Sequence, residues 1–514
     1  FGISGTNAHI ILEQAPPQAP VTEPVTPHSA IPWLLSARSP EALTAWPERL
    51  RPYTDRPAAT ATALATRTAF EHRAAIIGHH PDDFTHALTD LVPVHTTPTR
   101  PVFVFPGQGA QWPGMGTELL TTSPVFHDTI TRCQTALDPH IDWSLTHAMA
   151  DPELLERVDV VQPTLFAVMT ALAELWRHHG IQPTAVIGHS QGEIAAAHIA
   201  GALTLDDAAR IVALRSKLIA TTLTGHGGML SLATDPTTTQ TLLTPWNNHL
   251  SIAAVNGPNT TIVSGTPQAL DELTHTCHTH NIRTRRIAVD YASHSPQVET
   301  LRQELLTALT GIQPRPSTIP FYSTLTTTPL DTTTLDPTYW YQNLRHTVQF
   351  HTTTQNILTH QPTTFIEISP HPVLTPSIAE TIDTTTTPAT TLTTLHRNQG
   401  TLDRITTSLA QAWTHGHDIT WHDLLPTTTP TDIPTYPFQH QHYWLDHPTT
   451  NPTNTALTTP DHPFLQTCLE LADTDGLILT GRISPHTHPW LTHHTLQNTT
   501  ILPGTALAEL AIQA

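Results

Sequence analysis

The sequence has few cysteines, few charged residues and fewer basic than acidic groups. Its 514 residues include only three cysteines, Cys133, Cys277 and Cys468, whose spacing fits neither a disulfide framework nor a zinc site. The 22 basic residues against 42 acidic ones give a formal net charge of −20. This balance excludes the basic footprint of a nucleic-acid-binding protein and argues against binding to an anionic membrane surface. The cysteine usage favours a cytoplasmic protein.

Long apolar runs and a leader segment are also missing. No apolar run approaches the roughly 18 residues that span a bilayer, so we expect no membrane segment. The chain starts at Phe1 with a glycine turn and an apolar strand, and it stops at Ala514 within an apolar helical pattern. We therefore expect a piece of a longer protein, and its length predicts about three or four domains.

Composition divides the chain into segments of different character. The expected segments are 1–15, 16–100, 101–390, 391–446 and 461–514. The second begins proline-rich and continues as a small α/β linker domain, and the third alternates helical stretches with short apolar strands, which is typical of an α/β layer fold. Strands and helices within about 228–289 predict an inserted subdomain. We expect the aromatic cluster at 436–444 to pack on a neighbouring surface.

One motif of five residues carries the most chemical information. Gly-His-Ser-Gln-Gly at 188–192 follows the apolar run 185–187 and opens an alanine-rich stretch at 193–200, which predicts a strand, a tight turn and a helix. The two glycines leave room for a strained turn that exposes the Ser190 hydroxyl. The helix start offers backbone N–H groups and a positive dipole end to an oxyanion. The pattern predicts that Ser190 is a nucleophile.

A serine nucleophile needs a base and a group that selects its substrate. His294 follows the predicted strand 285–289 and is a candidate base, although a chain with 36 histidines offers many others. Arg215 lies in an apolar helical stretch, where an arginine either forms a surface salt bridge or binds an anion. Its planar guanidinium suits a carboxylate. The residues alone leave both interpretations of Arg215 open.

These motifs resemble those of a modular type I polyketide synthase. Residues 103–112, 188–193 and 291–294 match three acyltransferase motifs of that family in order and spacing. The resemblance covers nearly the whole chain. It implies an acyltransferase with an α/β-hydrolase-like core and an inserted ferredoxin-like small subdomain. The end of a ketosynthase and an α/β linker domain precede it, a further linker follows it, and a partial hot-dog dehydratase ends the chain.

The resemblance implies a role for each matching residue. Ser190 attacks the thioester carbonyl of an acyl-CoA, and His294 accepts its proton. The backbone N–H groups of Gln108 and Gln191 bind the oxyanion, and Arg215 binds the free carboxylate of a dicarboxylic acyl group. The phosphopantetheine thiol of an acyl carrier protein then accepts the acyl group. The chain is expected to bind no cofactor, to contact neighbouring ketosynthase and dehydratase domains, and to belong to a homodimeric synthase.

Three positions bear on which acyl group is selected: Tyr291, Ser293 and Gln191. Relatives that select malonyl groups have phenylalanine where this chain has Ser293, and the smaller side chain leaves space beside the α-carbon. Burying a methyl group in this space contributes about 0.8 kcal/mol to the binding free energy. A pocket typically discriminates between two substrates that differ by one methyl group by about 1–3 kcal/mol. Gln191 and the segment 157–163 also resemble the methylmalonyl subset. We therefore predict methylmalonyl-CoA as the substrate, with malonyl specificity as the alternative.

Two other functions remain open. A serine hydrolase or thioesterase shares the serine turn, but it would need an acidic residue between Ser190 and His294 and has no use for a buried arginine. A degenerate, inactive scaffold is the second alternative, against which the intact Gln108, Ser190, Arg215 and His294 argue. The acyltransferase family needs no acidic third member, and we expect a backbone carbonyl within 367–370 to orient His294.

The C-terminal segment resembles the opening of a dehydratase domain. Its motifs at 462–465 and 488–494 imply that His494 corresponds to the catalytic histidine of that family. The family has glycine where this chain has Asn498, a bulkier residue that could misplace the base, and aspartate where it has His493. We therefore expect no dehydration by this segment. Its histidines could also be interpreted as metal ligands, but histidine is frequent throughout the chain and we expect no metal.

Overall fold

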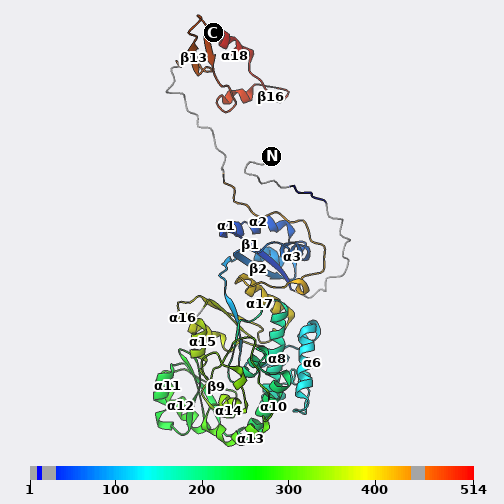
Figure 1. The fold of residues 1–514 in the computed structure, drawn as a ribbon, viewed down its shortest axis with the longest axis vertical. Helices are drawn as coiled ribbons and strands as arrows, with labels where there is room; N and C mark the ends of the chain where they lie inside the picture. Colours follow the sequence, from blue (N-terminus) through cyan, green and yellow to red (C-terminus); the bar gives the residue numbers. More distant parts are fainter. Residues whose placement is uncertain (1–8, 14–29, 360, 442–457) are drawn as a thin grey trace. The chain divides into compact units, whose positions relative to one another are not determined.

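The chain divides into two compact units, Phe1–Gln439 and His440–Ala514. The computed structural model describes residues 9–13, 30–359, 361–441 and 458–514 (Figure 1). Residues 9–13 are exposed and belong to no strand, so the predicted N-terminal strand was wrong there. No described strand pairs with these residues, and an isolated strand leaves its backbone groups without partners. The rest of the predicted strand lies outside the described residues.

A small α/β lobe opens the larger unit. Its antiparallel sheet has the order β1-β2-β3 and consists of β1 (Ile31–Ala37), β2 (His72–Gly78) and β3 (Val94–His95). Its helices are α1 (Pro40–Thr44), α2 (Trp46–Leu50), α3 (Pro57–Ala65) and α4 (Pro81–Ala87). Trp33 and Leu35 of β1 point into the core of this lobe, whereas Leu34 joins the main core of the unit. Successive side chains of β1 thus point to opposite faces of the sheet, and both faces are buried.

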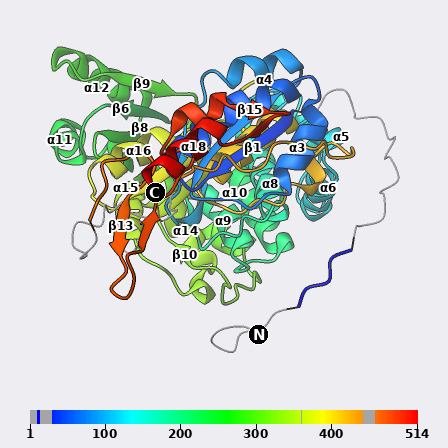
Figure 2. The same ribbon diagram turned by 90° about the horizontal axis from the view of Figure 1, so that it is seen from above.

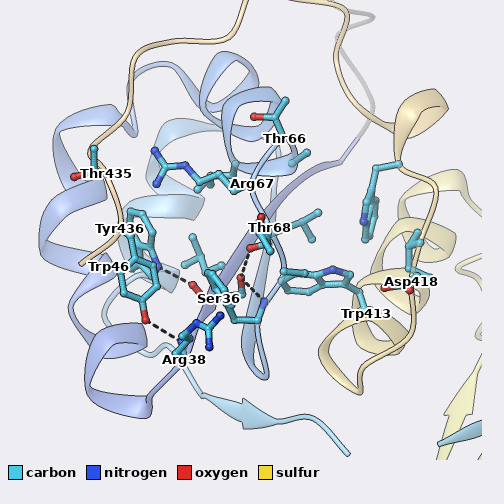
Figure 3. A pocket seen from close by; sticks show the side chains of 18 of the residues that line it. Ser36, Arg38, Trp46, Thr66, Arg67, Thr68, Trp413, Asp418, Thr435 and Tyr436 are labelled. Atoms are coloured by element: carbon cyan, nitrogen blue, oxygen red, sulfur yellow. Dashed lines mark hydrogen bonds between the residues drawn. The ribbon is translucent and has the colours of Figure 1, made fainter. Parts of the chain in front are cut away.

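The segment after helix α17 (Leu402–Thr414) returns to this lobe (Figure 3). The backbone N–H of Arg38 donates to the Tyr436 hydroxyl at 2.9 Å, and the Tyr436 ring meets Phe70 edge to face. A cavity of about 760 Å³ lies between the lobe and this segment, with Trp46 and Trp413 among its lining residues. The predicted packing of the aromatic cluster is confirmed for Tyr436, whereas residues 442–444 lie outside the described residues.

Five parallel strands form the central sheet, in the order β10-β5-β4-β11-β12. They are β4 (Arg100–Phe105), β5 (Ala185–Gly188), β10 (Phe321–Tyr322), β11 (Thr363–Glu367) and β12 (Ala389–Thr393). In β4, Phe103 and Phe105 point into the main core, while Val102 and Val104 point into a second core on the opposite face. A continuous apolar run is the pattern expected of a parallel strand covered on both faces.

Helices cover both faces of this sheet. The helices that pack on the sheet or on one another around it are α5 (Leu119–Thr122), α6 (Pro124–Leu137), α7 (Leu145–Ala148), α8 (Val158–His178), α9 (Gly192–Ile199), α10 (Leu205–Thr222), α13 (Arg302–Ala308), α14 (Pro337–Arg345), α15 (Phe350–Leu358) and α16 (Thr375–Asp383). Helix α8 is long and apolar enough to cross a membrane by length and composition, contrary to the expectation that no apolar run approaches this length. Its most apolar window is 89% buried within the unit, which is typical of a core helix.

A four-stranded antiparallel subdomain is inserted between α10 and α13 (Figure 2). Its elements are β6 (Gly228–Leu232), α11 (Pro236–Leu242), β7 (Leu250–Gly257), β8 (Thr260–Gly265), α12 (Pro267–Thr279) and β9 (Thr284–Ile287). The strand order β7-β8-β6-β9 with this succession of helices and strands is the ferredoxin-like arrangement. The predicted ferredoxin-like subdomain is confirmed.

The described residues of the second unit form two hairpins and one α-helix. They are β13 (Thr467–Glu470) with β14 (Leu477–Thr480), β15 (Thr495–Leu496) with β16 (Thr499–Thr500), and α18 (Gly504–Gln513). Gln497 and Asn498 form the tight turn of the second hairpin with φ angles of 49° and 61°. Asparagine is one of the few residues that tolerate this left-handed conformation, so Asn498 meets a backbone requirement that glycine also meets. Its side chain is exposed in this unit.

Candidate active site

Ser190 stands at a sharp turn between β5 and α9, as the motif predicts. Its backbone φ of 53° lies in the left-handed region, a strain that is commonly found at functional residues. A Cβ atom on Gly192 would lie 2.1 Å from the carbonyl oxygen of Phe105 in the neighbouring strand. Glycine is therefore needed at 192 because the turn packs directly on the backbone of β4.

His294, the predicted base, is hydrogen-bonded to Ser190. The Nε2 atom of His294 lies 2.9 Å from the Ser190 Oγ. Its Nδ1 lies 2.8 Å from the carbonyl oxygen of His346, which can only accept, so Nδ1 carries the proton and Nε2 accepts from the serine hydroxyl. The backbone N–H of His294 also donates to the Leu344 carbonyl. The C-terminal end of α14 thus holds both the ring and the backbone of His294.

The expectation that a carbonyl within 367–370 orients His294 was wrong. The carbonyls of that segment are engaged elsewhere: Glu367 accepts from the Thr394 hydroxyl, Ser369 from the Leu395 backbone and Pro370 from the Trp112 indole. The Glu367 carboxylate accepts from the backbone N–H groups of 373–375, where α16 begins. This segment caps a helix instead of orienting the base.

Burial keeps the imidazole of His294 neutral. Desolvation, followed by the nearby His189, lowers the pKa of His294 to about 3. A neutral imidazole that already accepts the serine proton in a hydrogen bond is suited to general-base catalysis near neutral pH. Because its orienting partner is a backbone carbonyl, the pair differs from the carboxylate-containing triad of α/β-hydrolases.

Gln108 and Gln191, two residues that line the same cavity as Ser190, have backbone N–H groups without an acceptor among the described residues. Gln191 immediately precedes α9. The Gln108 side chain accepts hydrogen bonds from Tyr291 and Gln162, which fixes the loop that carries its N–H group. The Gln191 amide is buried, and neither of its polar atoms has a partner within the described chain.

Arg215 is a buried cation on α10. It is 1% exposed, and its Nη1 donates to the Asn343 Oδ1 at 2.8 Å. Within the described part of the chain, its Nε has no hydrogen-bond partner and its guanidinium forms no ion pair with a carboxylate. Burial lowers the pKa of Arg215 to about 10, opposed by Tyr291 and then by Glu193. Arg215 therefore remains charged at neutral pH, and the surface salt bridge left open by the sequence is excluded.

One cavity of about 420 Å³ brings these residues together. Seven residues predicted for the site line it: Gln108, Ser190, Gln191, Arg215, Tyr291, Ser293 and His294. The ferredoxin-like subdomain supplies part of the opposite wall, including Asn256 and Arg285. Three arginines and no aspartate or glutamate occur among the described lining residues. In a chain with many more acidic than basic groups, this lining points to an anionic substrate.

His494 lies outside this cavity, in the second unit. Its side chain is exposed, and its Nδ1 lies 3.1 Å from the Ile501 carbonyl oxygen. Among the described residues, no group of three or more histidine, cysteine, aspartate or glutamate side chains is placed to hold a metal ion.

Four residues near the site were not predicted from the sequence: Gln162, Glu193, Asn343 and His346. Glu193 directly follows the serine motif and could have been suspected as a buried carboxylate. Gln162 lies within the segment 157–163 noted for its resemblance to the methylmalonyl subset, but no role was predicted for it. Asn343 and His346 act through a neutral amide and a backbone carbonyl, and neither leaves a recognisable spacing in a sequence.

Comparison with known families identifies the chain. Residues 102–419 match the family model described as the acyl transferase domain, and residues 462–514 match the polyketide synthase dehydratase domain. The chain belongs to the acyl transferase domain family. The match at its C-terminal end is the start of a dehydratase domain, and the homologues of this acyltransferase are modular type I polyketide synthases, as the resemblance predicted. The predicted fold class is likewise confirmed.

Relatives and solved structures support this assignment of the acyltransferase. The chain is 46% identical to polyketide synthase GfsB of Streptomyces halstedii and 47% identical to the pikromycin polyketide synthase component PikAII of Streptomyces venezuelae. All of the chain is aligned, but it spans only 10% and 14% of the lengths of these relatives.

Two solved acyltransferase domains also share its fold. The acyltransferase domain from module 8 of the salinomycin polyketide synthase matches with a TM-score of 0.73 and 47% sequence identity. The acyltransferase domain of SpnD, solved in complex with 2-(pent-4-yn-1-yl)malonyl, matches with a TM-score of 0.69 and 28% sequence identity. Each match covers 77% of this chain and 98% of the solved one.

Proposed function

We propose that the chain transfers a methylmalonyl group from coenzyme A to the phosphopantetheine thiol of an acyl carrier protein. The observation that carries this proposal is the shared cavity of Ser190, His294 and Arg215. The first two supply a nucleophile with its base, and the third is a buried cation that lacks an anionic partner among the described residues. A dicarboxylic acyl thioester offers both an electrophilic carbonyl and the missing anion.

In the acylation step, the Ser190 oxygen attacks the thioester carbonyl while His294 Nε2 takes the hydroxyl proton. The backbone N–H groups of Gln108 and Gln191 bind the negative charge that develops on the carbonyl oxygen. The carbon–sulfur bond breaks, and the imidazolium returns its proton to the thiolate of coenzyme A. The product is an ester between Ser190 and the diacid, whose free carboxylate pairs with Arg215.

The second step repeats this chemistry in reverse with a different thiol. His294 accepts the proton of the phosphopantetheine thiol, whose sulfur attacks the acyl-serine carbonyl. The ester bond to Ser190 breaks, and the serine oxygen takes the proton back from the imidazolium. The acyl group leaves as a thioester of the carrier protein, and both steps use the same base and the same oxyanion donors.

The cavity wall near Ser293 supports the preference for a branched diacid. Ser293 is 6% exposed and lines the cavity beside Tyr291, whose hydroxyl is hydrogen-bonded to Gln108 and Gln162. The small Ser293 side chain leaves volume that a phenylalanine would fill, and a methyl group gains by occupying it. The SpnD acyltransferase domain, a structural relative, was solved with a 2-substituted malonyl group.

The surrounding protein is part of the same proposal. The segments 1–15, 16–100, 101–390, 391–446 and 461–514 would be a ketosynthase end, a linker, the acyltransferase, a second linker and the dehydratase start. The partners would be a carrier protein and the neighbouring ketosynthase and dehydratase domains within a cytoplasmic homodimer. The chain would bind no cofactor of its own, because coenzyme A and phosphopantetheine act as substrates.

Competitive loading of the chain tests the substrate. The protein is mixed with equal concentrations of methylmalonyl-CoA and malonyl-CoA, and the acyl group on Ser190 is identified by intact-protein mass spectrometry. We expect mainly the methylmalonyl adduct, and no adduct on Ser190→Ala. Mainly malonyl adduct would contradict the proposed substrate, and no adduct from either thioester would support an inactive scaffold.

A further inference from the structure

A buried amide separates the two charged side chains behind the nucleophile. Asn343, on α14, is 4% exposed. Its Oδ1 accepts from Arg215 Nη1 at 2.8 Å, and its Nδ2 donates to Glu193 at 2.8 Å. The same Nδ2 lies 3.3 Å from the carbonyl oxygen of Ser190. One side chain therefore contacts the cation, the carboxylate and the turn that carries the nucleophile.

The orientation of the Asn343 amide follows from its neighbours. A guanidinium only donates hydrogen bonds and an ionised carboxylate only accepts them. The oxygen must therefore face Arg215 and the nitrogen must face Glu193. An aspartate in place of Asn343 could accept from Arg215 but could not donate to Glu193.

Glu193 is fully buried, and burial raises the pKa of its carboxyl group, whereas hydrogen bonds from neutral neighbours oppose this shift. Its carboxylate accepts from the Thr324 backbone N–H and hydroxyl, the Tyr339 hydroxyl and Asn343 Nδ2. These four donors are neutral. Hydrogen bonds of this kind stabilise a buried carboxylate without a direct salt bridge. The guanidinium of Arg215 forms no ion pair with it or with any other described carboxylate.

We propose that Asn343 is a positioning residue that holds Arg215 by a neutral acceptor and thereby keeps its charge available for the carboxylate of the substrate. The inference rests on the proposed function of Arg215. A carboxylate bonded directly to Arg215 would fix the side chain equally well, but it would neutralise the cation and compete with the diacid. Asn343 holds the guanidinium in place and lies between it and the Glu193 carboxyl group, so the two do not contact each other.

The test exchanges the two groups. Asn343→Asp places a carboxylate against Arg215. In the double variant Glu193→Gln with Asn343→Asp, the new amide at 193 can donate a hydrogen bond to the new carboxylate at 343. The net charge of the chain is the same as in the wild type. Tyr339→Phe removes one donor to Glu193 without touching Arg215 and is the matched control. Each full chain is loaded with methylmalonyl-CoA and with propionyl-CoA, which differ only in the free carboxylate, and the ratio of the two acylation rates is measured.

We expect the ratio of methylmalonyl to propionyl acylation rates to fall about tenfold or more in both variants that carry Asn343→Asp. This is the range for losing a hydrogen bond between charged groups. In Tyr339→Phe the ratio should stay at the wild-type value. A misfolded fraction lowers both rates equally and leaves the ratio unchanged. If the double variant keeps the wild-type ratio, the role of Asn343 is refuted while the function of the chain stands. If the wild-type chain shows no preference for the diacid, the proposed function and this inference both fail.

Discussion

The carbonyl oxygen of His346 lies 2.8 Å from Nδ1 of His294, and this contact fixes which ring nitrogen faces Ser190. The acceptor belongs to the chain just beyond α14, the helix that also presents Asn343 to Arg215. One helix end therefore contacts both the His294 imidazole and the buried Arg215 guanidinium. Burial, followed by the nearby His189, lowers the pKa of the imidazole, and the hydrogen bond to the His346 carbonyl opposes this shift.

The pH dependence of acylation follows from this environment. The base must be neutral, and the pKa of His294 is lowered from 6.5 to about 3, so protonation begins only at strongly acidic pH. We expect the single-turnover rate of Ser190 acylation to stay constant as the pH falls from 7 to about 5. Rapid-quench measurements at these pH values check this. A rate that halves near pH 6.5 would show that His294 titrates as an ordinary histidine.

Replacing Gly192 tests the packing of the serine turn. The Cβ atom of Gly192→Ala would overlap the backbone of Phe105, which cannot move without disturbing β4. We expect a loss of about 3 kcal/mol in the free energy of unfolding, the upper range for overpacking, together with loss of acylation. Urea titration measures the first effect. Gly504→Ala, where the added Cβ meets open space, is the control, and equal stability of the two variants would contradict the account.

The hydroxyl of Tyr291 is expected to position the loop of Gln108. Tyr291→Phe removes the hydrogen bonds to Gln108 and Gln162, so the Gln108 N–H group is held less firmly against the oxyanion. We expect kcat to fall about tenfold with little change in KM, because the oxyanion forms only during the reaction. Tyr341→Phe, whose hydroxyl bonds Glu299, serves as the control. A change confined to KM would refute this role.

Enlarging Ser293 should change the preferred acyl group. Ser293→Phe fills the space assigned to the methyl branch, so the ratio of methylmalonyl to malonyl loading should fall about tenfold. Ser293→Ala keeps that space and should keep the wild-type preference. Competitive loading followed by mass spectrometry gives both ratios. The interpretation fails if Ser293→Phe retains the preference of the wild-type chain.

The sequence predicts the parts of the site that depend on local patterns and on the family resemblance. The strand, turn and helix around Ser190 follow from glycine spacing and apolar runs, and the resemblance places His294 and Arg215 in one cavity. The partners of these residues could not be predicted. The His346 carbonyl has no side-chain signature, and Asn343 is one polar residue among many on an amphipathic helix. Only the folded end of α14 shows what each contacts.

The most direct test of the account compares acylation of the wild-type chain and Arg215→Ala by methylmalonyl-CoA and propionyl-CoA. Arg210→Ala, on the same helix but bonded to the Ala308 carbonyl, is the matched control. We expect Arg215→Ala to lose methylmalonyl loading by about 10- to 100-fold while propionyl loading is retained or improved. Arg210→Ala should behave as the wild type. Equal loss of both reactions in Arg215→Ala, or loss of neither, would contradict the assignment of Arg215 as the residue that binds the substrate carboxylate.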